Sequence, residues 1–264
     1  MEKAKAWEEL ELKDDFMFAK VMRNQILCKE LLQAIFPYMK IIHIEYPEEQ
    51  KSINITSDGK SVRLDVYVQD DAEIVYNIEI QSVDTGELPK RSRYYQGMID
   101  LNLIEKGEHY RNLKESFVIF ICTFDLFGKG RYLYTFRNLC VEDDAIELND
   151  GTAKVFLNAK GRRGSADPAL KEFLSYLDSG QIKGDFAKRI EKEVKRVREN
   201  KEWRREYMTL LMRDRENLEK GRKEGEEKML TLIECLIKDN RIDDIAKMKT
   251  DKTYRQKLYQ EYSL

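Results

Sequence analysis

Apolar and polar residues alternate along two neighbouring stretches of the chain, 63–68 and 74–81. Alternation with a period of two is typical of β-strands, because successive side chains point to opposite faces of a sheet. In the second stretch Ile78 and Ile80 share one face, and the polar residues between the apolar ones share the other. The short acidic segment 69–73 predicts the connecting turn, so the pattern as a whole predicts a β-hairpin.

The register of this hairpin decides which polar side chains meet. Symmetric pairing about Ala72 places Asp65 opposite Glu79 and Arg63 opposite Gln81. Side chains directly opposed on one face lie about 4.5–5.5 Å apart, where like charges repel. A bound divalent cation would explain two carboxylates in this position. The alternation alone favours the simpler alternative, a solvated polar face on an edge hairpin.

A helical pattern precedes the hairpin. Apolar residues at helical spacing predict one helix from Phe16 to Phe36, which Pro37 closes. Asp14 and Asp15 stand at its start, where the helix macrodipole favours negative charge. Either carboxylate is also a candidate to face a metal site.

A second helix is predicted over residues 90–105, directly after the hairpin. Arg91 and Arg93 lie near its start, and Tyr94 and Tyr95 follow. In an α/β fold the N-terminus of a helix that follows a strand lies near the end of that strand, where it favours a phosphate group. A crossover helix with solvated arginines and core tyrosines is the alternative.

The middle of the chain predicts the centre of a sheet. Residues 116–124 form a continuous apolar run, short enough for a strand that is buried on both faces. Further short strands are predicted at 132–136, 145–148 and 153–157, the last two joined by a turn at Asn149-Asp150-Gly151. We therefore expect an α/β fold.

The C-terminal part is helical in pattern and highly charged. Residues 160–165, rich in Gly and Arg, predict a flexible join, and Asp167 with Pro168 predicts a helix start. A long charged helix over residues 185–218 carries an apolar stripe that needs a partner surface, in the domain or in another protomer. We expect three regions: a core of residues 1–160, a charged helical region of residues 161–225, and a small helical tail of residues 226–264.

Composition excludes several classes of chemistry. The 4 Cys and 2 His are scattered, without the spacing that a zinc site or a disulfide framework needs. No glycine-rich phosphate-binding motif is present, so we expect no nucleotide cofactor. The N-terminus lacks the apolar core of a signal peptide, and no apolar run reaches the roughly 18 residues of a membrane span. We expect a cytoplasmic protein with reduced thiols and no membrane association.

The near-neutral net charge of −2 hides an asymmetry. Residues 1–80 hold 10 Lys and Arg against 16 Asp and Glu, whereas residues 160–225 hold 19 Lys and Arg against 13 Asp and Glu. The basic surplus lies downstream of the hairpin, where it is able to approach a polyanion. An ordinary charged helix surface is the alternative.

The motifs LKDDFMFAKVM, RLDVYVQDDAEIVYNIEIQ, RSRYYQ and ADPALKEFLSYL, in this order, resemble the Rpn family of recombination-promoting nucleases, also described as transposases. That family belongs to the PD-(D/E)XK nuclease superfamily, and the resemblance covers roughly residues 10–210. It implies a restriction-endonuclease-like mixed sheet flanked by helices, with a helical C-terminal extension. It also implies a metal-dependent DNA endonuclease associated with recombination, mobile elements or phage defence.

The resemblance also assigns roles to residues. Asp65 and Glu79 match the metal-binding carboxylates of the superfamily, and Gln81 stands where the superfamily usually has Lys. Asp15 resembles the acidic residue of the first helix, with Asp14 as a competing match. The backbone carbonyl of Ile80 is a candidate third ligand. The implied cofactor is Mg²⁺, with Mn²⁺ or Ca²⁺ as alternatives, and Gln81 puts catalytic efficiency in doubt.

Four residues near these carboxylates are candidates to contact DNA phosphates: Arg63, Arg91, Arg93 and Tyr95. The expected partner is DNA, and the C-terminal helices are candidates to form a homodimer or a higher oligomer. Two other functions stay open, a catalytically weak or inactive relative that binds DNA without cutting it, and an assembly module whose sheet is only a scaffold.

Overall fold

The computed structural model describes residues 5–46, 52–53 and 62–264, and the side chains of Ser52, Ile53, Val62 and Arg63 lie outside the described part. The chain forms two compact units, Lys5–Trp203 and Arg204–Leu264. The strands are β1 Ile44–Glu45, β2 Ser52–Ile53, β3 Val62–Arg63, β4 Val66–Asp70, β5 Val75–Gln81, β6 Ser116–Cys122, β7 Leu133–Phe136 and β8 Thr152–Asn158. The helices of the first unit are α1 Asp15–Met22, α2 Gln25–Ile35, α3 Leu88–Leu103, α4 Pro168–Ser179 and α5 Asp185–Glu199, with short 3-10 turns at Trp7–Glu9 and Tyr110–Asn112.

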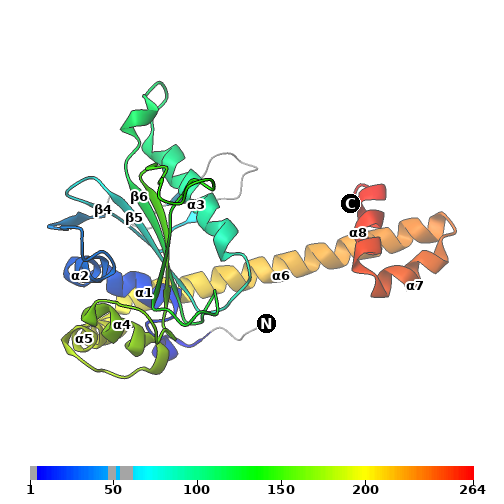
Figure 1. Cartoon of the computed structure of the whole chain (residues 1–264). Coiled ribbons are helices and arrows are strands. Elements are labelled where there is room, and N and C mark those ends of the chain that lie inside the picture. The colour runs from blue at the N-terminus through cyan, green and yellow to red at the C-terminus, as the bar shows by residue number, and fades with distance from the viewer. Residues whose placement is uncertain (1–4, 47–51, 54–61) are drawn as a thin grey trace. The chain divides into compact units, whose positions relative to one another are not determined.

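The first unit is built on a six-stranded mixed sheet in the order β1-β4-β5-β6-β8-β7 (Figure 1). β4 and β5 form the predicted hairpin, and their register pairs Val66 with Ile78 and Tyr67 with Asn77. This confirms the symmetric pairing about Ala72. β5, β6 and β8 are parallel, so their C-terminal ends meet at one edge of the sheet.

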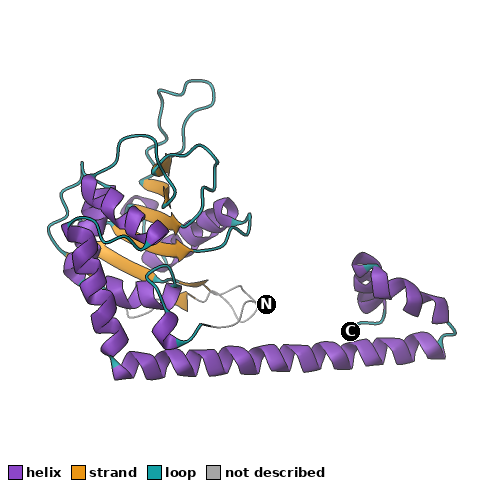
Figure 2. Cartoon of the chain, turned by 90° about the horizontal axis from the view of Figure 1, so that it is seen from below, coloured by secondary structure: helices purple, strands orange, loops and turns teal. Residues whose placement is uncertain are grey.

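Helices cover both faces of this sheet, as Figure 2 shows. On one face α3 packs over Val118 and Phe120 of β6. On the other face Phe36, at the end of α2, contacts Tyr76 and Phe117 with ring centroids 5.8 and 5.0 Å apart. The expected α/β fold is therefore confirmed. The solvated edge hairpin is wrong, because β5 lies between β4 and β6 and α3 covers its polar face.

Two predicted helices are interrupted by asparagine caps. The helix expected over residues 16–36 is broken between Met22 and Gln25, where the Asn24 side chain accepts hydrogen bonds from the backbone N–H groups of Ile26 and Leu27. Likewise, Asn200 has extended backbone dihedrals, so α5 ends at Glu199 and a new helix, α6 Lys201–Lys238, begins. In both places an Asn side chain satisfies N–H groups that a continuous helix would have paired internally.

Other local predictions have mixed outcomes. The central strand is confirmed, since all residues of β6 are buried. The expected strand at 145–148 does not form, and only an isolated bridge joins Leu139 to Glu147. β8 pairs instead with β7, which supplies the antiparallel neighbour. Asp167 caps α4 through its side chain, with Pro168 in the first helical position as expected.

The second unit consists of most of α6, then α7 Ile242–Thr250 and α8 Lys252–Glu261. A small core of Leu232, Leu236, Met248 and Leu258 holds these helices together. Gly221 and Gly225 lie inside α6, although glycine disfavours a helix interior, and the helix runs through both without a break. In the described part of the chain no helix is long and apolar enough to cross a membrane.

Candidate active site

A cleft of about 420 Å³ opens at the C-terminal end of β5. Its wall combines the start of α1, the loop before β4, the end of β5 and the first turns of α3. The cleft is lined by Lys13, Asp14, Asp15, Asp65, Glu79, Ile80, Gln81, Ser82, Val83, Thr85, Arg91 and Tyr95. Most of the residues that the sequence nominated therefore line one cavity.

Asp65 and Glu79 face each other at the mouth of the β4–β5 hairpin. The ladder stops at Val66, so Asp65 leaves the strand and turns toward the end of β5. Its backbone N–H donates to Oε1 of Glu79 at 3.2 Å, and its Oδ2 accepts from the N–H of Ile80 at 3.4 Å. Glu79 is only 1% exposed. Two carboxylates are thus held together, and one of them is removed from water.

Arg91 of α3 lies beside this pair. Its Nη2 donates to Oε2 of Glu79 at 3.1 Å, its Nη1 to Oε1 of Gln81 at 2.9 Å and its Nε to the Tyr95 hydroxyl at 3.0 Å. The guanidinium also lies over the rings of Tyr95 and Phe120, 5.1 and 5.4 Å from their centroids. This planar group is therefore fixed on several sides, which a flexible ammonium does not achieve as well.

Gln81 occupies the place where the resembling superfamily usually has Lys. Its Nε2 donates to the carbonyl oxygen of Ile80 at 2.6 Å, while its Oε1 accepts from Arg91. The amide therefore links Arg91 to the backbone carbonyl that was expected to be a metal ligand. A carbonyl oxygen has two lone pairs, so this bond leaves one for a cation.

The structure separates the two candidate aspartates of the first helix. Both oxygens of Asp14 accept from Nζ of Lys5, at 2.7 and 2.8 Å, and one also accepts from the N–H of Glu11. Asp14 thus serves local structure. Asp15 accepts from the N–H of Phe16 at 2.7 Å and contributes a negative charge that raises the pKa of Asp65.

Burial dominates the electrostatics of the pair. It raises the pKa of Glu79 to about 7, against the lowering effects of the Asp65 N–H group and of Arg91. It also raises the pKa of Asp65 well above its usual range, and the negative charges of Glu79 and Asp15 raise it further. Full ionisation of the pair is therefore costly in the folded protein, and a bound cation would offset that cost.

The donor set fits a hard divalent cation. Carboxylates and a backbone carbonyl are the oxygen ligands that Mg²⁺, Mn²⁺ and Ca²⁺ prefer. Asp65, Glu79 and the Ile80 carbonyl supply them at one spot, with Asp15 nearby. Within the described residues no group of three or more His, Cys, Asp or Glu side chains is arranged to hold a metal, so water would complete the coordination. Mg²⁺ commonly keeps several waters.

One expected phosphate contact does not line the cleft, a second falls outside the described side chains, and a charged lining residue was not foreseen. Arg93 is exposed on α3 and does not line the cleft, and the side chain of Arg63 lies outside the described residues. Lys13 lines the cleft beside Asp14 and Asp15. Its position immediately before the acidic pair was the available signal for it.

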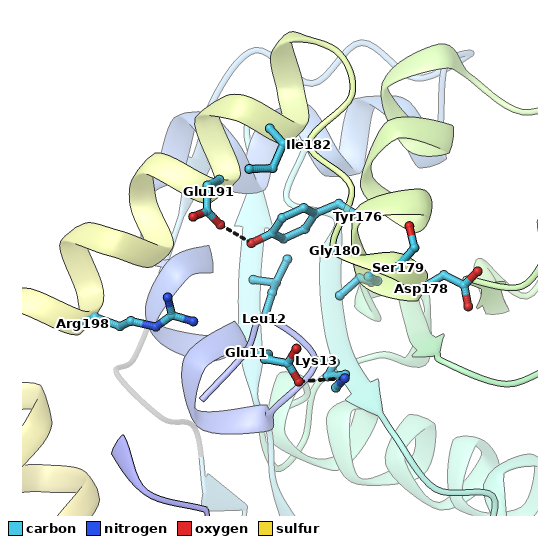
Figure 3. A pocket seen from close by; sticks show the side chains of 11 residues that line it. Glu11, Leu12, Lys13, Tyr176, Asp178, Ser179, Gly180, Ile182, Glu191 and Arg198 are labelled. Carbon is cyan, nitrogen blue, oxygen red and sulfur yellow. Dashed lines mark hydrogen bonds and ion pairs between the residues drawn. The ribbon is translucent and has the colours of Figure 1, made fainter. Parts of the chain in front are cut away.

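A second polar pocket of about 400 Å³ lies beyond Lys13, around the C-terminal end of α4 (Figure 3). There the Tyr176 hydroxyl donates to Glu191 at 2.6 Å, and Glu11 pairs with Lys13 at 2.7 Å. Asp178 adds another carboxylate to the lining, and the negative end of the α4 dipole points the same way. The carboxylates of this pocket, Glu11, Asp178 and Glu191, keep 55%, 22% and 19% of their side-chain exposure, and none forms a buried pair like Asp65 and Glu79. The first cleft is therefore the better candidate for metal-dependent phosphodiester chemistry.

The raised pKa values predict a pH-dependent stability. Between pH 5 and 8 the folded protein holds protons on the Asp65–Glu79 pair that the unfolded chain has released, so the unfolding free energy falls as pH rises. We expect Asp65→Asn to melt above wild type at pH 8 without divalent cations, because the amide carries no charge to bury and does not repel Glu79. Thermal denaturation in EDTA measures this.

Asp71 provides the opposite control. Its carboxylate accepts from the N–H groups of Ile42 and His43, at 2.9 and 3.1 Å, and these bonds lower its pKa. Asp71→Asn should therefore lower the melting temperature at pH 8. If Asp65→Asn also melts below wild type at pH 8, the assigned electrostatic strain at the pair is wrong.

Comparison with known proteins supports a family assignment. A family model described as PD-(D/E)XK nuclease family transposase matches residues 13–168, which is more than half of the chain and includes Asp15, Asp65 and Glu79. No curated protein and no solved structure gave a match. Nucleases of this superfamily generally use divalent metal ions. With the mixed sheet and the cleft described above, this match shows that the chain belongs to the PD-(D/E)XK nuclease family transposases.

Proposed function

We propose that this protein is a divalent-metal-dependent endonuclease that hydrolyses phosphodiester bonds in DNA. One observation carries the proposal: Asp65 and Glu79 lie side by side at an open cleft, with Glu79 almost fully buried and with the backbone of Ile80 hydrogen-bonded to Asp65. Buried like charges repel, so this arrangement lowers the stability of the folded protein. A function that uses the two carboxylates explains why it is present.

The proposed metal ligands are Asp65, Glu79 and the carbonyl of Ile80, and Asp15 lines the same cleft as a candidate to hold a bound water. A divalent cation at this position, Mg²⁺ in the first instance, supplies a nucleophilic water at neutral pH and offsets negative charge on the phosphate. The chain supplies the placement. Asp65 and the Ile80 amide are joined by a hydrogen bond, so the ligands on the two strands are fixed relative to each other.

Arg91 and Gln81 together fill the role of the lysine that the superfamily usually carries at position 81: Arg91 supplies the positive charge and Gln81 positions it. Arg91 provides a fixed positive charge at the cleft wall, 2.9 Å from the Gln81 amide oxygen. Developing negative charge on the scissile phosphate is stabilised by such a preorganised cation. Gln81 holds both Arg91 and the Ile80 carbonyl in place and therefore acts as a positioning residue.

A DNA-binding protein without cleavage is the second candidate. The observation that favours it is the state of Gln81, whose amide oxygen and nitrogen are both engaged in hydrogen bonds to the protein. No ammonium group therefore stands at that position to interact with the attacking water. This candidate keeps the cation site and the phosphate contacts but lacks turnover.

Conversion of supercoiled plasmid to nicked and linear forms tests the proposal. With Mg²⁺ or Mn²⁺ the wild-type protein should nick the plasmid. Excess EDTA should stop the reaction, because it removes the divalent cation and the oxygen ligands of the protein cannot supply that positive charge. Parallel reactions with double-stranded RNA define the substrate class. A folded protein that shifts DNA on a gel, yet cuts neither nucleic acid with any of Mg²⁺, Mn²⁺ or Ca²⁺, would establish the non-cleaving candidate instead.

A further inference from the structure

The loops after β6 and β8 are joined to each other by backbone hydrogen bonds. The N–H groups of Arg162 and Arg163 donate to the Gly130 carbonyl at 2.8 and 2.9 Å, and the N–H of Tyr132 donates to the Arg163 carbonyl at 3.2 Å. Residues 160–165, expected to be a flexible join, are therefore anchored. Gly161 is packed so closely that a Cβ atom would lie 2.6 Å from the Cα of Tyr132.

Side chains at the end of β8 and just after β6 make further contacts that fix the same pair of loops. Asn158, 2% exposed at the end of β8, donates through its side chain to the Arg131 carbonyl at 3.1 Å. Asp125 accepts from the N–H of Gly130 at 2.7 Å and from the Tyr134 hydroxyl at 2.9 Å. These hydrogen bonds lower the pKa of Asp125, so its ionised carboxylate stabilises the loop.

This anchored pair of loops presents a group of exposed cations, which we call the basic platform: Lys129, Arg131, Lys160 and Arg163. None of the four has an ion-pair partner within the described residues. The neighbouring Arg162 differs, because its Nη2 binds Asp178 at 2.8 Å. Arg131 and Arg163 lie close together, since the backbone of residues 131 and 163 forms a β-bridge.

The platform lies at the same edge of the sheet as the catalytic cleft. β5, β6 and β8 are parallel, and register pairs Gln81 with Cys122 and Cys122 with Asn158. The loops that carry the cations follow the C-terminal ends of β6 and β8, and the cleft lies at the C-terminal end of β5. β5 and β8 are two strand spacings apart, which amounts to about 10 Å. This is less than the roughly 12 Å width of the DNA major groove, so one duplex is wide enough to reach both the cleft and the platform.

We infer that the basic platform binds the phosphate backbone of duplex DNA beside the scissile bond. This inference rests on the proposed function, because a polyanionic substrate must already lie at the cleft. Cations fixed on a rigid backbone lose less freedom on binding than cations on a mobile loop, which is why anchoring favours a binding role. The contacts are made to phosphates, so they give affinity and orientation and no base preference.

Salt-dependent binding of a fluorescein-labelled DNA duplex, followed by anisotropy in EDTA, tests the platform. The variant Arg131→Ala/Arg163→Ala removes two platform cations that make no side-chain hydrogen bond or ion pair in the described part of the chain. The matched control, Lys106→Ala/Arg111→Ala, removes two exposed cations from the segment before β6, at the opposite edge of the sheet. Both variants change the net charge equally.

We expect the platform variant to bind the duplex roughly 10- to 100-fold more weakly at low salt, and the magnitude of its salt slope to fall by about 2, because each lost phosphate contact removes about 0.9. The control variant should keep the wild-type slope. Equal slopes for wild type and the platform variant would overturn the inference, and so would a wild-type protein that binds no duplex.

Cleavage of the same duplex in Mg²⁺ or Mn²⁺ is measured in parallel and separates the two proposals. A protein that binds through the platform and cuts nothing contradicts the nuclease proposal and leaves the platform standing. A protein that cuts, with the same binding in the platform variant as in wild type, overturns the platform alone. Melting curves of both variants, which lack only surface side chains, verify that the fold is retained.

Discussion

Replacing Asp65 or Glu79 by alanine is expected to reduce DNA cleavage by about 10³-fold or more. Each substitution removes a proposed cation ligand, and the charge stabilisation that a bound divalent ion supplies is worth several kcal/mol, with about 1.4 kcal/mol per factor of ten. The measurement is the rate of plasmid nicking by each variant at saturating Mg²⁺. DNA binding in EDTA should change far less, because neither carboxylate attracts a phosphate.

The matched control is Asp71→Ala, which removes an exposed carboxylate from the turn of the same hairpin. Its nicking rate should stay near that of wild type. Folding is verified by melting, and Asp65→Ala should not melt below wild type at pH 8, since it relieves the repulsion at the pair. Wild-type nicking rates in both Asp65→Ala and Glu79→Ala would refute the proposed site.

Arg91→Ala is expected to lower the turnover rate by about 10²-fold, with a smaller change in KM. The guanidinium places a positive charge 3.1 Å from Glu79, and loss of one preorganised charge-stabilising donor typically costs 10²–10³ in rate. Single-turnover and steady-state cleavage kinetics separate the two parameters. Arg93→Ala is the control, because Arg93 is exposed on the same helix and does not line the cleft.

A second substitution tests whether Arg91 replaces the lysine of the superfamily. Gln81 contacts Arg91 directly, so a lysine at position 81 would bring its ammonium group into the space that the guanidinium leaves. Arg91→Ala/Gln81→Lys should therefore recover at least about tenfold of the lost rate. If the double variant is no faster than Arg91→Ala, or if Arg91→Ala behaves like Arg93→Ala, Arg91 does not have this role.

The sequence was sufficient where neighbouring residues decide the structure. The alternation on either side of Ala72 determined the hairpin, its register and the opposition of Asp65 and Glu79, because a slip by one residue would expose one whole apolar face. The apolar run of β6 and the Asp167–Pro168 helix start were likewise local. The sequence was insufficient at Asn24 and Asn200, where a polar side chain competes with helix continuation.

The functional site depended on contacts between distant residues. Nothing local to Glu79 predicted that α3 would cover it and raise its pKa to about 7, and nothing local to Arg91 predicted its three hydrogen bonds. The choice between Asp14 and Asp15 required Lys5 to be placed. Burial and charge coupling are sums over neighbours in space, and these sums are absent from a periodic pattern.

At the basic segment, residues 160–165, composition determined one property and the tertiary structure decided another. Its composition determined that cations would be exposed there, since Lys and Arg flanked by Gly are rarely buried. Composition also suggested flexibility, and only the tertiary structure replaced it with a rigid connection to the loop at Gly130. The sequence by itself thus determined the hairpin, the candidate carboxylates and the family resemblance. The tertiary structure decided which charges meet, because parallel strands bring the ends of distant segments to one edge of the sheet.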